Sequence, residues 1–335
     1  MNAMRLFEPG PAEDNRLKQV ERPIPQPGAG QVRLKVLACG VCHTDLHTVE
    51  GEIHPPSLPV TPGHQVVGVV DALGPGTEGR VKLGERVGVP WLHFACGECE
   101  FCQRGLENLC PNAQFTGFHV DGGYAGYMLA RANYVLPLPE VLSDEQIAPL
   151  LCAGIVGYRS LRLSDVKPGE RLGLVGFGAS AHLVIQVAHY WGCDVYVFTR
   201  APEHRRHAEE LGAAWTGGVE DSPPKPLDRA IIFAPSGKLV PPMLEKLRPG
   251  GTLAVNAIHT SPIPEMPYNL IYGERTLRSV ANATYQDGVE FLELAAKIPV
   301  LATVTLYNLA DANQALLDMK HSRINGEAVL KVAMV

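Results

Sequence analysis

The most specific pattern in this chain is a group of four cysteines between residues 96 and 110. Three of them are separated by two residues each, in Cys96-Gly-Glu-Cys99-Glu-Phe-Cys102, and Cys110 follows after seven more. Four thiolates in one short loop can close a tetrahedral shell around zinc and leave no position open for chemistry. Disulfides are the alternative, but they are typical of secreted chains, and this N-terminus lacks the pattern of a signal peptide. The spacing therefore predicts a structural zinc lobe.

Three further residues of metal-binding type lie far apart in the sequence: Cys42, His64 and Cys152. Two thiolates and one imidazole would give zinc three protein ligands, with the fourth position free for water or substrate. A lone buried cysteine or histidine is most often an ordinary core residue, and spacing alone does not assemble this trio. Cys39 and Cys42 also form a C-x-x-C pair, but the strand–helix–strand context of a redox dithiol is absent there.

A glycine turn, Gly176-Phe-Gly178-Ala179-Ser-Ala181, follows a predicted strand and opens a predicted helix. Gly176 allows a tight turn, Gly178 lets backbone amides approach a pyrophosphate, and Ala181 permits close helix–sheet packing. The positive end of the helix would then face the phosphates. Alone, the motif also fits a plain strand-to-helix turn. Among alternating strands and helices it predicts a dinucleotide site.

The residues that end the second strand of this region favour NADP(H) over NAD(H). An NAD site usually has Asp or Glu there, about 20 residues after the glycines. Here the strand ends in Thr199 and Arg200, Arg205 follows, and Asp194 lies at the opposite end of the strand. A guanidinium can pair with a 2′-phosphate, which a carboxylate would repel. A solvated basic helix face is the competing interpretation.

Two kinds of segment must position these residues. Up to about residue 150 the chain reads as short strands and turns, with β-rich runs at 32–38 and 66–72. Strands and helices then alternate, which is typical of a mostly parallel, doubly wound sheet. The predicted strands are 171–175, 195–198, 229–233 and 252–255, and the predicted helices are a segment containing Ala181 to Ala188, 203–211 and 237–247. Near residue 285 the alternation stops, and a helix at 287–297 leads into a mixed tail.

Composition excludes several classes of protein. The chain has 335 residues, which is about two domains' worth, with 46% apolar residues and a net charge of −6. That acidic balance argues against a nucleic-acid partner, which needs a concentrated basic surface. The longest apolar stretch, 147–158, is too short and too interrupted to span a membrane. Eight cysteines without an export signal predict a reducing, cytoplasmic location.

Over essentially its whole length the chain resembles the zinc-dependent medium-chain alcohol dehydrogenases. The matching pieces are Gly40-Val-Cys42-His-Thr-Asp45, Gly63-His64, the four-cysteine lobe, Cys152-Ala-Gly154, the turn at Gly176 and the final return to the first domain. The resemblance implies an α/β plus β fold, with a GroES-like catalytic domain over 1–153 and 286–335, its zinc lobe at 91–112, and a Rossmann domain over 154–285. It also implies two zinc ions per subunit and a homodimer or homotetramer.

The same resemblance implies a reaction and the residues that perform it. Cys42, His64 and Cys152 would ligate the catalytic zinc. Thr44 would contact a zinc-bound alkoxide, and His47 would end a proton relay through the cofactor ribose. Hydride transfer to or from NADP(H) would interconvert primary or secondary alcohols with aldehydes or ketones. The expected partner is thus a small alcohol or carbonyl compound.

Three more positions receive roles, and three others depart from the family pattern. Asp45 would orient the ligating imidazole, His43 would lie near the cofactor pyrophosphate, and Trp91 would lie near the substrate pocket. The departures are Gln65, where relatives usually have Glu after the histidine ligand, Glu327, where many have an arginine that binds pyrophosphate, and Val156, where a threonine is common. Since Glu327 cannot bind a pyrophosphate, another cation or the helix end must do so.

Two other functions compete with this one. Zinc-dependent polyol dehydrogenases often bind zinc with a glutamate and can lack the four-cysteine lobe, so the intact trio and lobe count against that class. A non-catalytic redox sensor with structural zinc only would hold one zinc per subunit and would need neither Thr44 nor His47. A zinc module for nucleic acid is opposed by the acidic balance. The sequence does not identify the physiological substrate.

Overall fold

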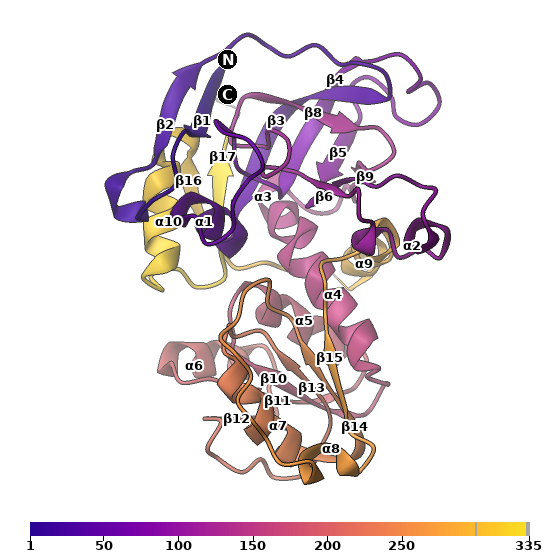
Figure 1. Ribbon diagram of the computed structural model, residues 1–335, viewed down its shortest axis with the longest axis vertical. Coiled ribbons are helices and arrows are strands. Elements are labelled where there is room, and N and C mark those ends of the chain that lie inside the picture. Colours follow the sequence, from indigo (N-terminus) through magenta and orange to yellow (C-terminus); the bar gives the residue numbers. More distant parts are fainter. Residues whose placement is uncertain (299, 333–335) are drawn as a thin grey trace. The chain divides into compact units, whose positions relative to one another are not determined.

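The computed structural model describes residues 1–298 and 300–332 (Figure 1). The chain divides into two compact units, one formed by Met1–Cys152 with Thr284–Val335 and the other by Ala153–Ala283. Residues 299 and 333–335, which the expected catalytic domain includes, lie outside the described residues. The first unit is therefore discontinuous in sequence, and the second is one continuous segment.

The first unit is built on a mainly antiparallel sheet with the strand order β16-β17-β3-β4-β5-β9, and β8 also pairs with β3. Inward and outward residues alternate along the first half of β3, as expected for a strand with one face in the core. The strands are β3 (Gln31–Val41), β4 (Val66–Leu73), β5 (Arg86–Val89), β8 (Tyr127–Arg131), β9 (Leu136–Pro137), β16 (Val304–Asn308) and β17 (Glu327–Lys331).

Two small strand pairs and several helices complete the first unit. The pairs are β1 (Asn2–Leu6) with β2 (Leu17–Glu21) and β6 (Leu92–Phe94) with β7 (Gln114–Phe115). The helices are α1 (His43–Glu50), α2 (Glu100–Gln103), α3 (Asp144–Ile147), α9 (Tyr285–Lys297) and α10 (Ala312–Lys320), with 3-10 turns at Ala12–Asp14, Glu107–Leu109, Ala148–Leu151 and Leu309–Asp311.

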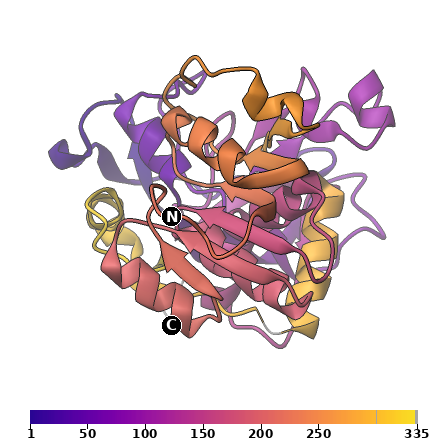
Figure 2. The same cartoon turned by 90° about the horizontal axis from the view of Figure 1, so that it is seen from below.

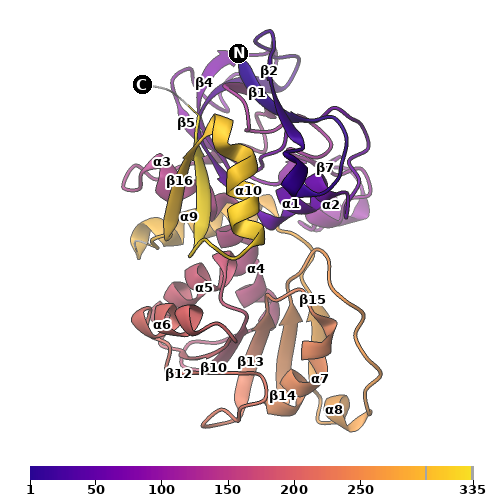
Figure 3. The ribbon, with the colours of Figure 1, turned by 90° about the vertical axis from the view of Figure 1, so that its left-hand side faces the viewer.

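The C-terminal strand β17 lies inside this sheet, between β16 and β3. Val329 of β17 pairs with Gly40 of β3, two residues before Cys42. Figure 3 shows β16, β17 and α10 together in yellow, with the helix lying against the two strands. The tail of the chain therefore lies directly beside the strand that leads into the first metal-type cysteine.

The second unit is a parallel sheet with helices alternating along the chain (Figure 2). Six strands of the described chain form it in the order β12-β11-β10-β13-β14-β15, which is the doubly wound order of dinucleotide-binding sheets. The strands are β10 (Arg171–Val175), β11 (Asp194–Phe198), β12 (Trp215–Gly217), β13 (Leu227–Ile232), β14 (Leu247–Val255) and β15 (Thr276–Ser279). The helices are α4 (Ala153–Ser164), α5 (Ala179–Tyr190), α6 (Pro202–Glu210), α7 (Val240–Lys246) and α8 (Asn269–Tyr272), with a 3-10 turn at Gly237–Leu239.

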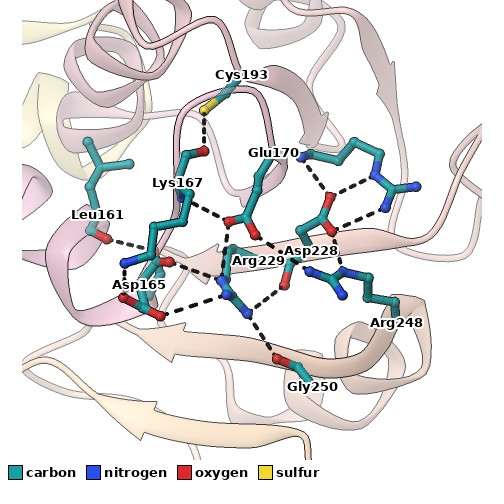
Figure 4. A network of polar contacts seen from close by, with 11 residues as sticks. Leu161, Asp165, Lys167, Glu170, Cys193, Asp228, Arg229, Arg248 and Gly250 are labelled. Atoms are coloured by element: carbon teal, nitrogen blue, oxygen red, sulfur yellow. Dashed lines mark hydrogen bonds and ion pairs between the residues drawn. The ribbon is translucent and has the colours of Figure 1, made fainter.

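A network of ion pairs lies at the amino ends of strands β10 and β13 (Figure 4). The buried Asp228 carboxylate accepts hydrogen bonds from the backbone N–H of Arg171 (2.9 Å), from its guanidinium (2.7 Å) and from Arg248. Arg229 pairs with Glu170 at 3.4 Å. Burial alone would raise the pKa of Asp228, but the bonds from Arg171 and Arg248 hold it at about 2.

Several periodic segments match the predicted elements, whereas other elements were missed. The segments 171–175, 195–198 and 252–255 lie in β10, β11 and β14, and the predicted strand 229–233 lies in β13 up to Ile232. Sequence analysis did not predict β12 and β15 or the helices α4 and α10. The two strands are short, and β15 is mostly exposed, so neither carries the apolar alternation of a core strand. Among the described residues, no helix has the length and apolar character required to cross a membrane.

Candidate active site and metal centres

The structure brings Cys42, His64 and Cys152 together in the first unit. Their ligand atoms all lie within 4.8 Å of one another. Cys42 caps the N-terminus of α1 directly after β3, His64 lies just before β4, and Cys152 follows the 3-10 turn that ends at Leu151. Three turns at strand and helix ends thus converge, an arrangement that spacing along the chain did not predict.

Asp45 holds two members of this trio in place. Its buried carboxylate accepts hydrogen bonds from His64 Nδ1 (3.1 Å) and the Gly63 N–H (3.0 Å) through Oδ1, and from the Cys42 N–H (2.9 Å) and the Tyr124 hydroxyl (3.3 Å) through Oδ2. Because Nδ1 donates its proton to Asp45, the neutral imidazole would present its lone pair at Nε2. Within the described part of the chain, Nε2 is buried without a hydrogen-bond partner.

The charges around the trio favour a cation. The pKa of the Cys42 thiol lies well below its usual value, because a hydrogen bond from the Cys152 thiol and the positive charge of a protonated His64 outweigh burial. Burial would lower the pKa of His64, but the Asp45 carboxylate and the Cys42 thiolate raise it to about 10. Two sulfurs and one imidazole nitrogen, with anionic neighbours and no competing partner for Nε2, form a donor set that fits zinc.

The four-cysteine lobe brings its sulfur atoms within 4.8 Å of one another. The Sγ atom of Cys96 lies 3.5 Å from that of Cys110 and 3.9 Å from that of Cys102, far beyond the roughly 2.05 Å of a disulfide. All eight cysteines of the chain are free thiols. Backbone N–H groups of Glu98 and Cys99 lower the pKa of Cys96 to about 6. The alternative of paired disulfides is therefore wrong for this structure, and the four thiols fit a closed zinc site.

Thr44, His47 and His43 lie on α1, the helix that begins after Cys42. The hydroxyl of Thr44 lies 3.8 Å from the Cys42 sulfur. His47 forms a close contact through Nδ1 with the carboxylate of Glu52, and its ring centroid lies 6.3 Å from that of the exposed His43.

Sequence analysis missed Glu52, although a signal was present. Helix α1 ends at Gly51 in a left-handed conformation, and the N–H of Glu52 donates to the carbonyl of His47 at 2.9 Å. This helix-ending motif turns the chain back over the last helical turn, so the residue after the glycine lies beside His47. A histidine four residues before a terminal glycine could have predicted the pair.

An aromatic cluster flanks the trio. The Trp91 ring lies edge-on to the His64 ring with centroids 4.8 Å apart, and it stacks on Phe115 at 5.0 Å. Phe118 lies 5.8 Å from Trp91 and 5.0 Å from His119. The apolar wall beside the metal-type residues is thus larger than the single tryptophan that sequence analysis named.

The glycine turn of the second unit has the local geometry that a dinucleotide site requires. Gly176 has φ +84°, and a Cβ atom there would lie 3.1 Å from the backbone nitrogen of Ala234. Gly178 caps α5 without any side-chain hydrogen bond, so the first amides of Ala179 and its neighbours stay available to an anion. Ala181 is fully buried, which fits close packing of α5 on the sheet.

The end of β11 carries no acid. Thr199 is buried, and its carbonyl accepts a hydrogen bond from Arg205 Nε at 2.9 Å. Arg200 is exposed and forms no hydrogen bond or ion pair with the described residues. Asp194 begins β11 and so lies at the opposite end of the strand. Of the two nearby arginines, Arg205 braces the strand end and Arg200 is available to a ligand.

The side chains of Gln65 and Glu327, two positions that depart from the family pattern, contact each other. Gln65 Nε2 donates to Glu327 Oε1 at 2.5 Å, and both side chains are buried. Sequence analysis treated the two positions separately and considered Glu327 only as the loss of a phosphate-binding arginine. In the structure this carboxylate points to the residue after His64.

Known proteins with similar sequences and structures agree with this architecture. Residues 28–140 match the family described as "Alcohol dehydrogenase GroES-like domain", and residues 181–297 match "Zinc-binding dehydrogenase". A probable alcohol dehydrogenase of Mycobacterium tuberculosis is 44% identical over 99% of this chain and 97% of its own length. An alcohol dehydrogenase of Geobacillus stearothermophilus is 36% identical over 94% of this chain and 95% of its own.

A solved cinnamyl alcohol dehydrogenase of Sorghum bicolor superposes with a TM-score of 0.89 at 29% identity, covering 98% of this chain and 97% of the other. These matches span both units, and they confirm the predicted fold class of a GroES-like domain joined to a parallel Rossmann sheet. The chain therefore belongs to the zinc-dependent medium-chain alcohol dehydrogenases, oxidoreductases that use a nicotinamide cofactor.

Proposed function

We propose that this enzyme interconverts primary or secondary alcohols with aldehydes or ketones, prefers NADP(H), and holds a catalytic zinc at Cys42, His64 and Cys152. The convergence of these three residues, with a buried His64 Nε2 that has no partner among the described residues, carries the proposal. When bound, zinc would supply Lewis acidity that polarises the substrate oxygen and lowers its proton affinity.

The residues of this chain would then orient the substrate and move a proton. Asp45 fixes the His64 ring so that Nε2 faces the two thiolates. The Thr44 hydroxyl, 3.8 Å from the Cys42 sulfur, is close enough to the trio to hydrogen bond a substrate oxygen. Glu52 contacts Nδ1 of His47 and orients the ring, and an imidazole at this position could exchange a proton with solvent.

The four-cysteine lobe would hold a second zinc with a structural role. Four thiolates leave no open coordination position, so this metal would stabilise the fold without contacting substrate. We accordingly assign residues 1–153 and 286–335, with the lobe at 91–112, to the catalytic domain and residues 154–285 to the cofactor domain. His43 and the turn at Gly176 are the proposed pyrophosphate contacts.

The proposed substrates carry an apolar group beside the reacting carbon. Trp91, Phe115 and Phe118 form a wall of rings next to His64 and offer few hydrogen bonds to extra hydroxyl groups. This observation favours simple alcohols over the polyols of the competing class.

The preference for NADP(H) rests on the end of β11. Arg200 is exposed there, and neither the last residues of the strand nor the two residues after it are acidic. Arg200→Asp should therefore change the ratio of kcat/KM for NADPH to kcat/KM for NADH by about 10- to 100-fold towards NADH, the value of a charge-assisted contact. Arg206→Asp makes the same charge change on exposed α6 and serves as the matched control. An equal ratio shift in both variants would contradict the assignment to Arg200.

The second unit also supports the proposal of a homodimer or homotetramer. Strand β15 lies at the edge of the sheet and is mostly exposed. The nearby α8 exposes Tyr272 to 72%, and Tyr268 just before it to 70%. Light scattering of the purified chain, with Tyr272→Glu as the variant expected to weaken assembly, tests this point. A reducing, cytoplasmic location is proposed because metal-binding thiols must stay reduced.

The decisive experiment combines activity with metal counting. Initial rates would be measured with NADPH and NADH against a panel of aldehydes and alcohols, before and after chelation, with zinc per subunit determined on the same sample. Two zinc ions and chelator-sensitive, NADPH-dependent reduction are the expected result. One zinc and no turnover would instead favour a non-catalytic nucleotide-binding protein.

A further inference from the structure

A buried carboxylate near the trio has few partners among the residues that the structure describes. Glu327 begins strand β17 and is only 3% exposed. Its Oε1 accepts one hydrogen bond, from the amide of Gln65, and its Oε2 is buried without a partner among the described residues. No lysine or arginine of the described chain forms an ion pair with it.

Such a placement is costly for the protein alone. Burying an ionised carboxylate costs several kcal/mol unless an opposite charge or several hydrogen bonds offset the loss of water. One amide bond is not enough: the Cys42 thiolate and the Asp45 carboxylate repel the charge of Glu327, and the attraction of His64 does not offset them. Burial, and next the Cys42 thiolate, raise the pKa of Glu327 well above its ordinary value. The protein groups alone therefore oppose the charge of this carboxylate.

The metal-type residues are within electrostatic reach of Glu327. It bonds the side chain of Gln65, the residue directly after His64, and its strand β17 pairs with β3 up to the residue before Cys42. Two thiolates around a zinc ion cancel its formal charge, and the carboxylates of Asp45 and Glu327 add negative potential around it. Without the ion, the thiolates and Asp45 repel the carboxylate of Glu327, so a divalent cation held by the trio would reduce the cost of burying it.

The pair of Gln65 and Glu327 is built into the sheet. Gly40 of β3 lies against Gln65, and a Cβ atom there would lie 2.6 Å from Gln65 Nε2. The same Gly40 pairs with Val329 of β17, two residues beyond Glu327. Because residue 40 is a glycine, no side chain blocks the path of the Gln65 amide towards the Glu327 carboxylate. The backbone of the two paired strands thus fixes the geometry of the pair.

We propose that Glu327 is an accessory carboxylate of the catalytic metal centre, positioned by Gln65, and that its negative charge strengthens retention of the metal bound by Cys42, His64 and Cys152. The inference rests on the proposed catalytic zinc. It makes Glu327 a positioning and charge residue of the centre. The two departures from the family pattern then act together. Strand β17 carries the buried carboxylate of Glu327, and the neutral amide of Gln65 follows the histidine ligand.

The test is zinc competition on the full chain with a chromophoric chelator, with the zinc of the trio identified as the one missing in Cys42→Ser. Glu327→Gln keeps shape and hydrogen-bonding capacity but removes the charge, and zinc retention by the trio should weaken about 10-fold or more. The matched control is the double exchange Gln65→Glu with Glu327→Gln, which restores one carboxylate and one amide in the same pair. It should recover most of the lost affinity.

Thermal unfolding of the metal-depleted and zinc-loaded forms supplies a second readout. Without zinc, Glu327→Gln should be at least as stable as the parent chain, because an unbalanced charge has been removed. With zinc, its gain in midpoint temperature should be smaller than that of the parent. If Glu327 only packed in the core, the exchange would lower the unfolding midpoint of both forms together and leave zinc affinity unchanged. That result would overturn the inference.

Failure of the inference differs from failure of the proposed function. Unchanged zinc affinity in Glu327→Gln, with the trio loaded in the parent chain, removes the role of Glu327 and leaves the catalytic zinc intact. A parent chain that binds the same single zinc as Cys42→Ser removes both.

Discussion

The four-cysteine lobe would take all the ligands of its proposed zinc site from residues 96–110, whereas the trio would combine Cys42, His64 and Cys152 from three distant segments. In the lobe, short turns supply the geometry, and backbone N–H groups at 3.4 and 3.5 Å stabilise the sulfurs. In the trio, the carboxylate of Asp45 fixes the geometry, because it accepts hydrogen bonds from the backbone of Cys42 and Gly63 and from the ring of His64. A closed site can thus form around its metal locally, while an open site needs a finished domain to hold the ligands apart from the position that substrate must enter.

The largest expected effect separates the two sites by activity. Cys42→Ser removes one trio ligand, and because the metal supplies several kcal/mol of transition-state stabilisation, kcat/KM should fall by about 1000-fold or more. The fold should survive, since the trio lies on elements held by the sheet. Steady-state kinetics with circular dichroism on the same sample measure both. Robust turnover in this variant would remove the catalytic assignment.

In the four-cysteine lobe we expect a large loss of stability and a smaller loss of activity. Cys99→Ser opens the four-thiolate shell, and because structural zinc binding is folding free energy, the unfolding midpoint should fall by about 5 °C or more. The loss in stability should exceed that of Cys42→Ser, and the loss in kcat/KM should be smaller. Differential scanning calorimetry with zinc counting checks the pair. Equal losses of stability and of kcat/KM in both variants would contradict the assignment of one structural site and one catalytic site.

A smaller effect tests how the open site is held. Asp45→Asn keeps the shape of the side chain but weakens its grip on His64 Nδ1, and zinc affinity or kcat/KM should fall about 10- to 100-fold. Tyr124→Phe removes only the 3.3 Å hydroxyl contact to the same carboxylate and should lower zinc affinity or kcat/KM much less. If the two variants behaved alike, Asp45 would be acting through packing and not through the imidazole.

The second unit provides a third kind of anchor, made of charge pairs without metal. Asp228 has a pKa of about 2 in the folded chain against 3.8 as its ordinary value. A depressed pKa contributes stability above about pH 4 that is lost as the pH falls towards 2. Asp228→Asn should therefore lose roughly 2 kcal/mol of unfolding free energy at pH 7, with a difference that shrinks below pH 4.

Asp165→Asn is the control for that experiment, because the side chains of Asp165 and of its closest partner Lys167 are both 61% exposed, its pair with Arg229 is long at 3.7 Å, and such surface pairs contribute little. Urea unfolding at pH 7 and at pH 3 measures both variants. A constant difference at the two pH values would assign the effect of Asp228 to lost packing.

The lobe could be predicted from the sequence, whereas the partners of the trio could not, for a physical reason. Local spacing determines which sulfurs of residues 96–110 can meet. The contact of Gln65 with Glu327 depends on strand β17 entering the sheet beside β3, which no local pattern reports. The same holds for Tyr124, which reaches Asp45 from a distant loop. The signal for the Gln65 pair was present only as two departures, a carboxylate lost at position 65 and one gained at position 327.

The position of β17 also sets an order of assembly during synthesis. The second unit is continuous, so its parallel sheet can form as soon as residues 153–283 have left the ribosome. The first unit must wait, since β17 is an interior strand between β16 and β3 and carries Glu327 to the trio. Until then, the outer edge of β3 beside Cys42 is unpaired. A nascent or prematurely ended chain would thus expose a strand edge and a half-built thiol pocket, a species suited to recognition by chaperones and proteases.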